Sequence, residues 1–186
     1  MKWRECLVNL FYRAATGSRG IRNLLTPFGA LFFVLMLALL VFASFRLDRF
    51  LGWPEFPAGF WTLVLCVLFL AKGLFLWLWS LVCFIKAGGT PVPFNPPPRL
   101  LTDGPYAWVR NPMISGVFCL MFGVGFLLKS PSLVFFFTPA FILISVLELK
   151  IIEEPELEKR LGREYLEYRK MVPMFFPWGN KSPGRN

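Results

Sequence analysis

The sequence predicts an all-α integral membrane protein with about four transmembrane helices, including a C-terminal helical hairpin, and a cytosolic C-terminal helix. Of its 186 residues, 56% are hydrophobic and only 17% are charged, whereas a soluble domain has about 25% charged residues. The uncharged residues also form stretches long enough to cross a bilayer as helices. Together these features exclude a compact water-soluble enzyme and a disordered chain.

The first two spans are predicted by long apolar stretches. Between Arg22 and Arg46 there are 23 residues without a charge, and a bilayer core of about 30 Å requires about 20 apolar residues in a helix. The second stretch runs from Phe60 to Ile85 and is interrupted only by Lys72. A lysine at this depth is costly unless it faces the interior of the bundle or water, so we expect Lys72 to do one of these.

Two shorter apolar stretches follow, at Pro112 to Leu128 and Leu133 to Leu147. At 1.5 Å per residue each is about 25 Å long, just enough to cross the bilayer when the two pack side by side. Only four residues separate them, which predicts a tight antiparallel helical hairpin. Pro139 is a potential break in the second arm.

The segment from Glu153 to Lys170 is rich in charged residues, but Leu157, Leu161, Tyr165 and Tyr168 recur in it at helical spacing. This pattern predicts a surface helix that packs its apolar face on the bundle or the membrane interface. Pro173 ends the helix, and Phe175, Phe176 and Trp178 are suited to anchoring the tail at headgroup level.

The basic residues indicate how the chain is oriented. The net charge is +9, and Lys and Arg favour the cytoplasmic side of a membrane. Their excess in residues 1–26 and in the loop 86–111 predicts that both termini and this loop are cytoplasmic, so nucleic acid is not an expected partner. We expect one membrane domain over 1–186, with a basic segment (1–26), two spans (24–85), a Pro/Gly-rich loop (86–111), the hairpin (112–147) and a cytosolic tail (148–186).

Several kinds of catalysis are excluded by composition. The chain has no histidine, which excludes serine–histidine and cysteine–histidine catalysis. Its four cysteines form no C-x-x-C pair, and the spans hold almost no carboxylates. A conventional metal site is therefore not expected.

Charged and polar residues are predicted to meet at one end of the hairpin. Asn111 and Pro112 suit the cap and the first position of a helix, and Arg110 beside this helix start favours an anion. Because the hairpin arms are antiparallel, the start of the first arm and the end of the second lie on the same face. The residues gathered there are Tyr106, Arg110, Asn111, Glu148, Lys150, Glu153 and Glu154. Position alone fits a ligand site and a charged helix end equally well.

Two segments carry a family resemblance. GPYAWVRNPMISG (104–116), followed by two apolar helices and EEPELEKRLGREYLEYRKMVPMFFP (153–177), resembles the isoprenylcysteine carboxyl methyltransferase and phospholipid methyltransferase superfamily. The superfamily signature is R-H-P, a glutamate pair, G-x-x-Y-x-x-Y and V-P. The resemblance covers roughly residues 86–178. It implies an integral-membrane methyltransferase that uses S-adenosylmethionine, with a lipophilic substrate entering from the membrane.

The resemblance also implies roles for individual residues. The cofactor would be contacted or framed by Tyr106, Arg110, Asn111, Pro112, Glu153, Glu154 and Tyr165, and catalysis would involve Arg110, Glu153 and Glu154. Two positions depart from the family pattern: Asn111 stands where a histidine is usual, and Lys150 where an arginine is frequent. Lys150 would meet a substrate carboxylate without the bidentate fork of arginine.

Methyl transfer from a sulfonium is compatible with a site that lacks histidine. A carboxylate or thiolate acceptor needs no general base, whereas a phospholipid amine must lose a proton, for which Glu153 and Glu154 are candidates. Two alternatives remain open. One is a membrane reductase that uses NADPH, and the other is a non-enzymatic membrane docking protein.

Overall fold

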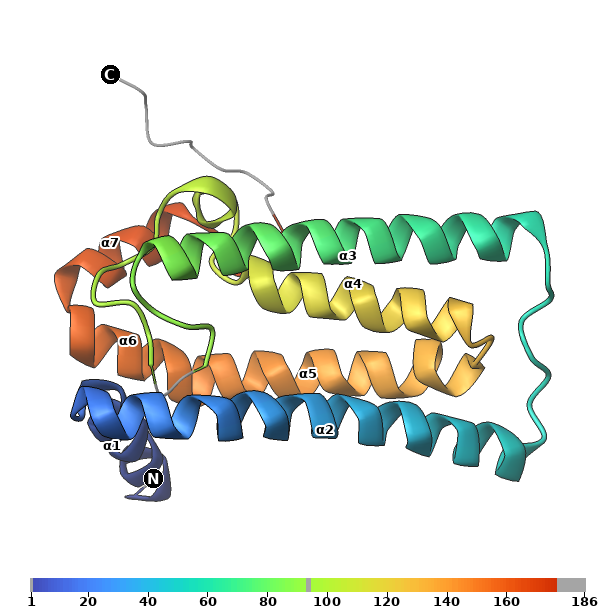
Figure 1. The fold of residues 1–186 in the computed structure, drawn as a ribbon, viewed down its shortest axis with the longest axis horizontal. Helices are drawn as coiled ribbons and strands as arrows, with labels where there is room; N and C mark the ends of the chain where they lie inside the picture. Colours follow the sequence, from blue (N-terminus) through green and yellow to red (C-terminus); the bar gives the residue numbers. More distant parts are fainter. Residues whose placement is uncertain (1, 93–94, 177–186) are drawn as a thin grey trace. The chain divides into compact units, whose positions relative to one another are not determined.

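The computed structural model describes residues 2–92 and 95–176, and within these ranges all regular structure is helical (Figure 1). The elements in chain order are α1 (Lys2–Thr16), α2 (Arg19–Leu51), α3 (Phe60–Lys86), the 3₁₀ turn η1 (Gly104–Ala107), α4 (Pro112–Leu127), the π-helical stretch η2 (Leu133–Phe137), α5 (Thr138–Glu148), a second π stretch η3 (Leu149–Glu153), α6 (Glu154–Leu161) and α7 (Arg163–Met171).

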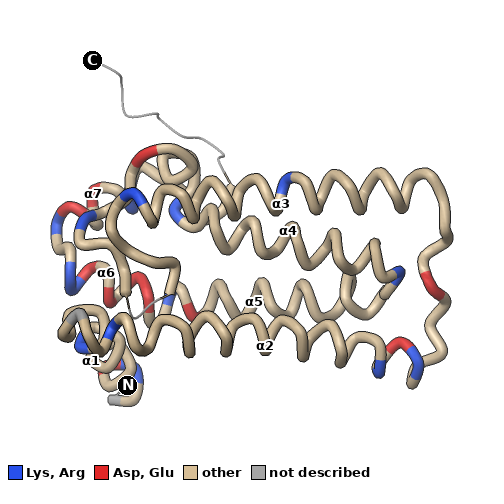
Figure 2. The backbone as a smooth tube through the Cα atoms, viewed as in Figure 1, with Lys and Arg blue, Asp and Glu red and all other residues tan. Residues whose placement is uncertain are grey.

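Three helical stretches in the described residues are long and apolar enough to cross a membrane: Gly20–Leu51, Phe60–Lys86 and Leu133–Leu161. The helix α4 is a shorter apolar helix. Figure 2 shows that the charged residues are concentrated in loops and near helix ends, while long parts of α2 to α5 carry almost none. The predicted all-α membrane fold is therefore confirmed.

The chain forms two compact units, which we describe separately. Unit 1 comprises the described parts of Met1–Ala30, Trp79–Pro112 and Val146–Asn186, and unit 2 comprises Leu31–Leu78 and Met113–Ser145. Unit 1 thus brings together the basic N-terminal segment, the Pro/Gly-rich loop and the C-terminal helices. All the residues of the candidate site lie in unit 1.

In unit 2, α3 and α4 pack closely because glycines line their contact. A Cβ atom at Gly73 would lie 2.7 Å from the backbone nitrogen of Leu120, and one at Gly116 would lie 2.9 Å from the carbonyl oxygen of Gly73. Since Gly73 faces α4, the adjacent Lys72 is turned about 100° away around the helix and is exposed. Of the two placements expected for Lys72, the interior of the bundle is therefore excluded.

The hairpin turn of unit 2 is held by Asp48 at the end of α2. The Asp48 carboxylate accepts hydrogen bonds from the Ser130 hydroxyl at 2.5 Å and from the Ser132 backbone N–H at 2.9 Å. Beyond the turn the second arm continues through Pro139. The π stretch η2 ends at Phe137 and α5 begins at Thr138, so Pro139 lies in the first turn of α5, where a proline is tolerated. The break that Pro139 threatened does not occur.

The C-terminal part of unit 1 differs from the predicted arrangement. The sequence predicts that the second arm ends at Leu147, whereas the helix continues through η3 into α6. The predicted tail helix is instead two helices, α6 and α7, because Gly162 has a φ of +60° between them, a conformation that favours glycine. The predicted apolar face packs as expected: Tyr165, Tyr168 and Val172 form a core with Leu100, Leu157 and Leu161. Trp178 lies outside the described residues.

Candidate functional site

A tight turn before α4 carries Tyr106 into the interior of unit 1. Gly104 begins the turn with a φ of +61° and lies so close to Trp79 that a Cβ atom would be 3.2 Å from its indole nitrogen. Tyr106 follows in η1 and is 6% exposed. The helix α4 then begins at Pro112, as predicted, so Arg110 and Asn111 stand immediately before its first turn.

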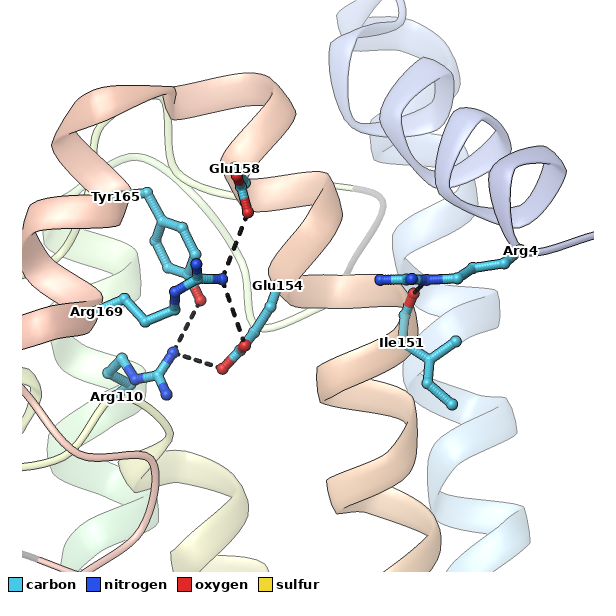
Figure 3. A network of polar contacts seen from close by, with 7 residues as sticks. All are labelled: Arg4, Arg110, Ile151, Glu154, Glu158, Tyr165 and Arg169. Atoms are coloured by element: carbon cyan, nitrogen blue, oxygen red, sulfur yellow. Dashed lines mark hydrogen bonds and ion pairs between the residues drawn. The ribbon is translucent and has the colours of Figure 1, made fainter. Parts of the chain in front are cut away.

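Arg110 is the centre of a polar network that joins this turn to α6 and α7 (Figure 3). Its guanidinium donates to the Glu154 carboxylate at 2.5 Å and to the Tyr165 hydroxyl at 3.1 Å. Arg169 approaches the other oxygen of Glu154 at 3.8 Å and Glu158 at 3.4 Å. The side chains of Arg110 and Glu154 are only 11% and 14% exposed, so the charge of Glu154 is compensated by two guanidinium groups in a mostly buried place.

Backbone hydrogen bonds hold the two resembling segments against each other. The N–H of Arg110 donates to the carbonyl of Pro173 at 2.9 Å, and the N–H of Asn111 donates to that of Met174 at 3.2 Å. The Tyr168 hydroxyl donates to the carbonyl of Tyr106 at 2.7 Å. The R-N-P and V-P segments, about 60 residues apart in sequence, therefore form one structural element.

A cavity of about 150 Å³ adjoins this network within unit 1. Five of the residues that the resemblance implied for the cofactor site line it: Tyr106, Arg110, Asn111, Glu153 and Tyr165. Glu148, which was expected on the same face, also lines it. Three others do not. Pro112 is fully buried at the start of α4, Lys150 is exposed, and Glu154 faces Arg110 and Arg169.

The charges that line the cavity fall into paired and unpaired groups. Arg110 pairs with Glu154, and Arg160 pairs with Glu156 at 2.9 Å. Among the described residues, Glu148, Glu153 and Arg99 line the cavity without an ion-pair partner. The cavity therefore presents two glutamate side chains and one arginine side chain that have no ion-pair partner in the described residues. The same described residues contain no group of three His, Cys, Asp or Glu side chains suited to a metal ion.

The Pro/Gly-rich loop forms one wall of the cavity and is held in place by α6. Arg160 donates to the carbonyl of Pro97 at 3.2 Å, and Thr90 and Asn95 close a turn through a backbone hydrogen bond of 2.8 Å. Glu156, which fixes Arg160, is 6% exposed. Sequence analysis missed Glu156, Arg160 and Arg99. The i,i+4 spacing of Glu156 and Arg160 was a usable signal for a pair, whereas nothing local marks Arg99.

The tyrosines of the site remain neutral at physiological pH. Burial raises the pKa of Tyr165 to about 12, and the nearby Glu154 carboxylate acts in the same direction against the opposing effect of Arg110. Burial also raises the pKa of Tyr106 and of Tyr168 above the usual range. Each hydroxyl therefore keeps its proton and can act as a hydrogen-bond donor.

Comparison with known proteins identifies the family of the chain. A family model described as phospholipid methyltransferase matches residues 60–164, which is more than half of the chain. The chain belongs to the phospholipid methyltransferase family. The predicted superfamily is thus confirmed. No curated protein and no solved structure gives a significant match.

The phospholipid methyltransferase match contains most of the candidate site. It runs from the start of α3 through α6 and includes Arg110, the glutamate pair and the Pro/Gly-rich loop. It ends at residue 164, directly before Tyr165. As a member of this family with helices long and apolar enough to span a bilayer, the chain is a membrane methyltransferase.

Proposed function

We propose that the chain transfers a methyl group from S-adenosylmethionine to a lipophilic acceptor, and that the cavity of unit 1 holds the cofactor. The balance of unpaired charge is the observation that carries this proposal. S-adenosylmethionine has two cationic groups, its ammonium and sulfonium, and one carboxylate. Once ionised, Glu148 and Glu153 together with Arg99 form the opposite set of charges, and bound cationic groups favour the ionised form of both glutamates. A partly buried carboxylate without a partner is costly, so cationic ligand groups stabilise this arrangement.

The charge of the cavity also argues against a nicotinamide cofactor. NADPH carries several negative phosphate charges, which two unpaired carboxylates repel more than one guanidinium attracts.

The cavity volume of about 150 Å³ is below the range of roughly 300–1,000 Å³ that is common for small-molecule sites. We therefore expect S-adenosylmethionine to fill this cavity and to extend beyond it.

In this proposal some residues of the site bind the cofactor and others orient Arg110. Glu153 and Glu148 bind cationic groups, while Arg99 binds the cofactor carboxylate. Glu154 and Tyr165 fix the guanidinium of Arg110, which leaves Arg110 oriented toward the cavity that it lines. When bound, S-adenosylmethionine supplies a methyl group on a sulfonium, which is open to in-line displacement. Holding donor and acceptor aligned contributes about 7–11 kcal/mol to such a reaction.

The acceptor determines whether a base is needed. An isoprenylcysteine-like carboxylate or a thiolate attacks without one, whereas the amine of a phospholipid has to lose a proton first. Glu148 and Glu153 are the carboxylates of the cavity that have no ion-pair partner in the described residues and so are candidates for that base. We place the cavity and both termini on the cytoplasmic side, because basic residues are concentrated in the segments that form unit 1.

Calorimetry with the purified full chain in nanodiscs tests the proposal. We expect S-adenosylmethionine to bind and NADPH not to bind. Incubation with cofactor that carries a labelled methyl group and a membrane lipid extract, followed by mass spectrometry, identifies the acceptor by the label that it gains. Binding of NADPH alone favours the reductase, and binding of neither by folded protein favours a docking protein.

Separate alanine substitutions of Arg99 and Lys150 test which of these two cations binds the carboxylate of S-adenosylmethionine. We expect Arg99→Ala to weaken binding of S-adenosylmethionine by roughly 10-fold or more, since a hydrogen bond to a charged group contributes about 1.5–3 kcal/mol. Arg99 and Lys150 are both exposed, but only Arg99 lines the cavity, so Lys150→Ala is expected to change the affinity by no more than about twofold. Calorimetric Kd values decide, and a larger effect at Lys150 would contradict the assignment of Arg99.

A further inference from the structure

The N-terminal helix α1 (Lys2–Thr16) packs on the candidate site with only part of its apolar surface. It contacts η3 and α6, with Val8 and Ala15 buried. Arg4 donates to the carbonyl of Ile151 at 3.1 Å (Figure 3). On the other side, the ammonium of Lys159 donates to Asn9 at 2.6 Å and lies 4.4 Å from the centre of the Tyr12 ring.

A second apolar stripe on α1 faces away from these contacts. Trp3 and Leu10 are 61% and 60% exposed, and the exposed Cys6 lies between them. Positions 3, 6 and 10 have the spacing i, i+3 and i+7, which places them on one face of a helix. We call these three residues the outer stripe. The apolar surface of α1 is therefore wider than the part of it that η3 and α6 cover.

The chain connection determines what lies beside the outer stripe. The first membrane span begins at Gly20, only four residues after α1 ends, so α1 is held at the level where the span leaves the bilayer. A helix with an apolar face and flanking basic residues lies in the headgroup region of a membrane, and Trp is enriched at that depth. Exposed Arg13 supplies a cation next to the stripe, and anionic lipid attracts such groups.

We propose that α1 is an interfacial membrane helix, with its outer stripe of Trp3, Cys6 and Leu10 inserted among bilayer lipids at the headgroup level. Phe11, about 100° from Leu10 around the same helix, lines the cavity of unit 1. Lipid contact thus holds α1 in the position where it forms a wall of the cavity. This assignment of α1 does not depend on the reaction that the cavity performs.

Spin labels measure the depth of α1 directly. The full chain, with its four native cysteines replaced by alanine, is labelled at Leu10→Cys or at Glu5→Cys and placed in nanodiscs that contain anionic lipid. Glu5 is exposed and lies off the outer stripe, so it is the matched control. We expect oxygen to reach the label at position 10 better than a water-soluble nickel chelate does, and the reverse at position 5.

Two results would overturn the proposal. If the nickel chelate reaches both labels equally, the stripe faces water; if neither reagent reaches position 10, protein such as a second copy covers it. A second measurement keeps the native cysteines in case their removal impairs folding. Subtracting the fluorescence of Trp3→Phe from that of the native chain gives the fluorescence of Trp3. We expect lipids brominated near the headgroup to quench this Trp3 fluorescence. No quenching would also place Trp3 outside the lipid.

Discussion

Arg110→Ala is expected to lower the free energy of unfolding by about 3–5 kcal/mol and to abolish measurable binding of S-adenosylmethionine. Removing one partner of a buried ion pair has a cost of this size because it leaves the other charge uncompensated. After the substitution, Glu154 keeps only Arg169, at 3.8 Å, and Tyr165 loses the donor to its hydroxyl. Denaturation in detergent measures the first effect, and calorimetry on the protein that remains folded measures the second.

Two variants control for the role of charge in this result. The double variant Arg110→Ala/Glu154→Ala removes both charges, so it should regain part of the lost stability while still failing to bind the cofactor. Arg163→Ala breaks an exposed pair with Glu167, whose side chains are 91% and 56% exposed, and should change stability by at most about 0.5–1 kcal/mol. If the double variant is no more stable than Arg110→Ala, an uncompensated Glu154 charge is not the cause of the loss.

Glu153→Gln is expected to weaken binding of S-adenosylmethionine without the loss of stability expected for Arg110→Ala. Glu153 lines the cavity and has no ion-pair partner among the described residues, so a neutral isostere should leave stability unchanged or raise it. Affinity for S-adenosylmethionine should fall by roughly 30-fold or more, which corresponds to the 2–5 kcal/mol that a close buried charge pair contributes to binding. Methyl transfer to a lipid extract should fall with it.

The neighbouring glutamates supply the controls for this substitution. Glu154→Gln weakens the contact with Arg110 and should destabilise the chain, and Glu158→Gln, at an exposed position on α6, should alter neither stability nor affinity appreciably. Measuring denaturation and cofactor binding for all three variants separates the roles. Affinity for the cofactor within twofold of the native value in Glu153→Gln would rule out Glu153 as the partner of a cationic group.

The spans could be predicted from sequence because the bilayer imposes one simple requirement. A helix that satisfies its own backbone hydrogen bonds and carries about 20 apolar residues is the available solution, and the predicted Phe60–Ile85 differs from α3 by a single residue. The start of α4 at Pro112 was equally predictable, since Asn and Pro suit the cap and the first position. The family signature then pointed to the segments that meet in unit 1.

Details that depend on rotation around a helix were beyond the sequence. Glu153 and Glu154 are adjacent, so they point about 100° apart, and nothing local indicates which one meets Arg110 and which one lines the cavity. The sequence left two placements open for Lys72 for the same reason, because its direction follows from the packing of Gly73 on α4. Arg99 lies in an irregular loop, where no periodicity assigns a direction to a side chain.

The π stretch η3 ends directly before the second of these two glutamates. Such a stretch holds more residues per turn than the helix on either side, and π stretches are frequent at functional sites. The gain or loss of one codon at this point would turn the acidic doublet by about 100° relative to the preceding helix without changing either glutamate. An inserted residue would bring Glu153 to the direction that Glu154 has now and turn Glu154 beyond it, so the carboxylate that meets Arg110 can change while both glutamates are retained.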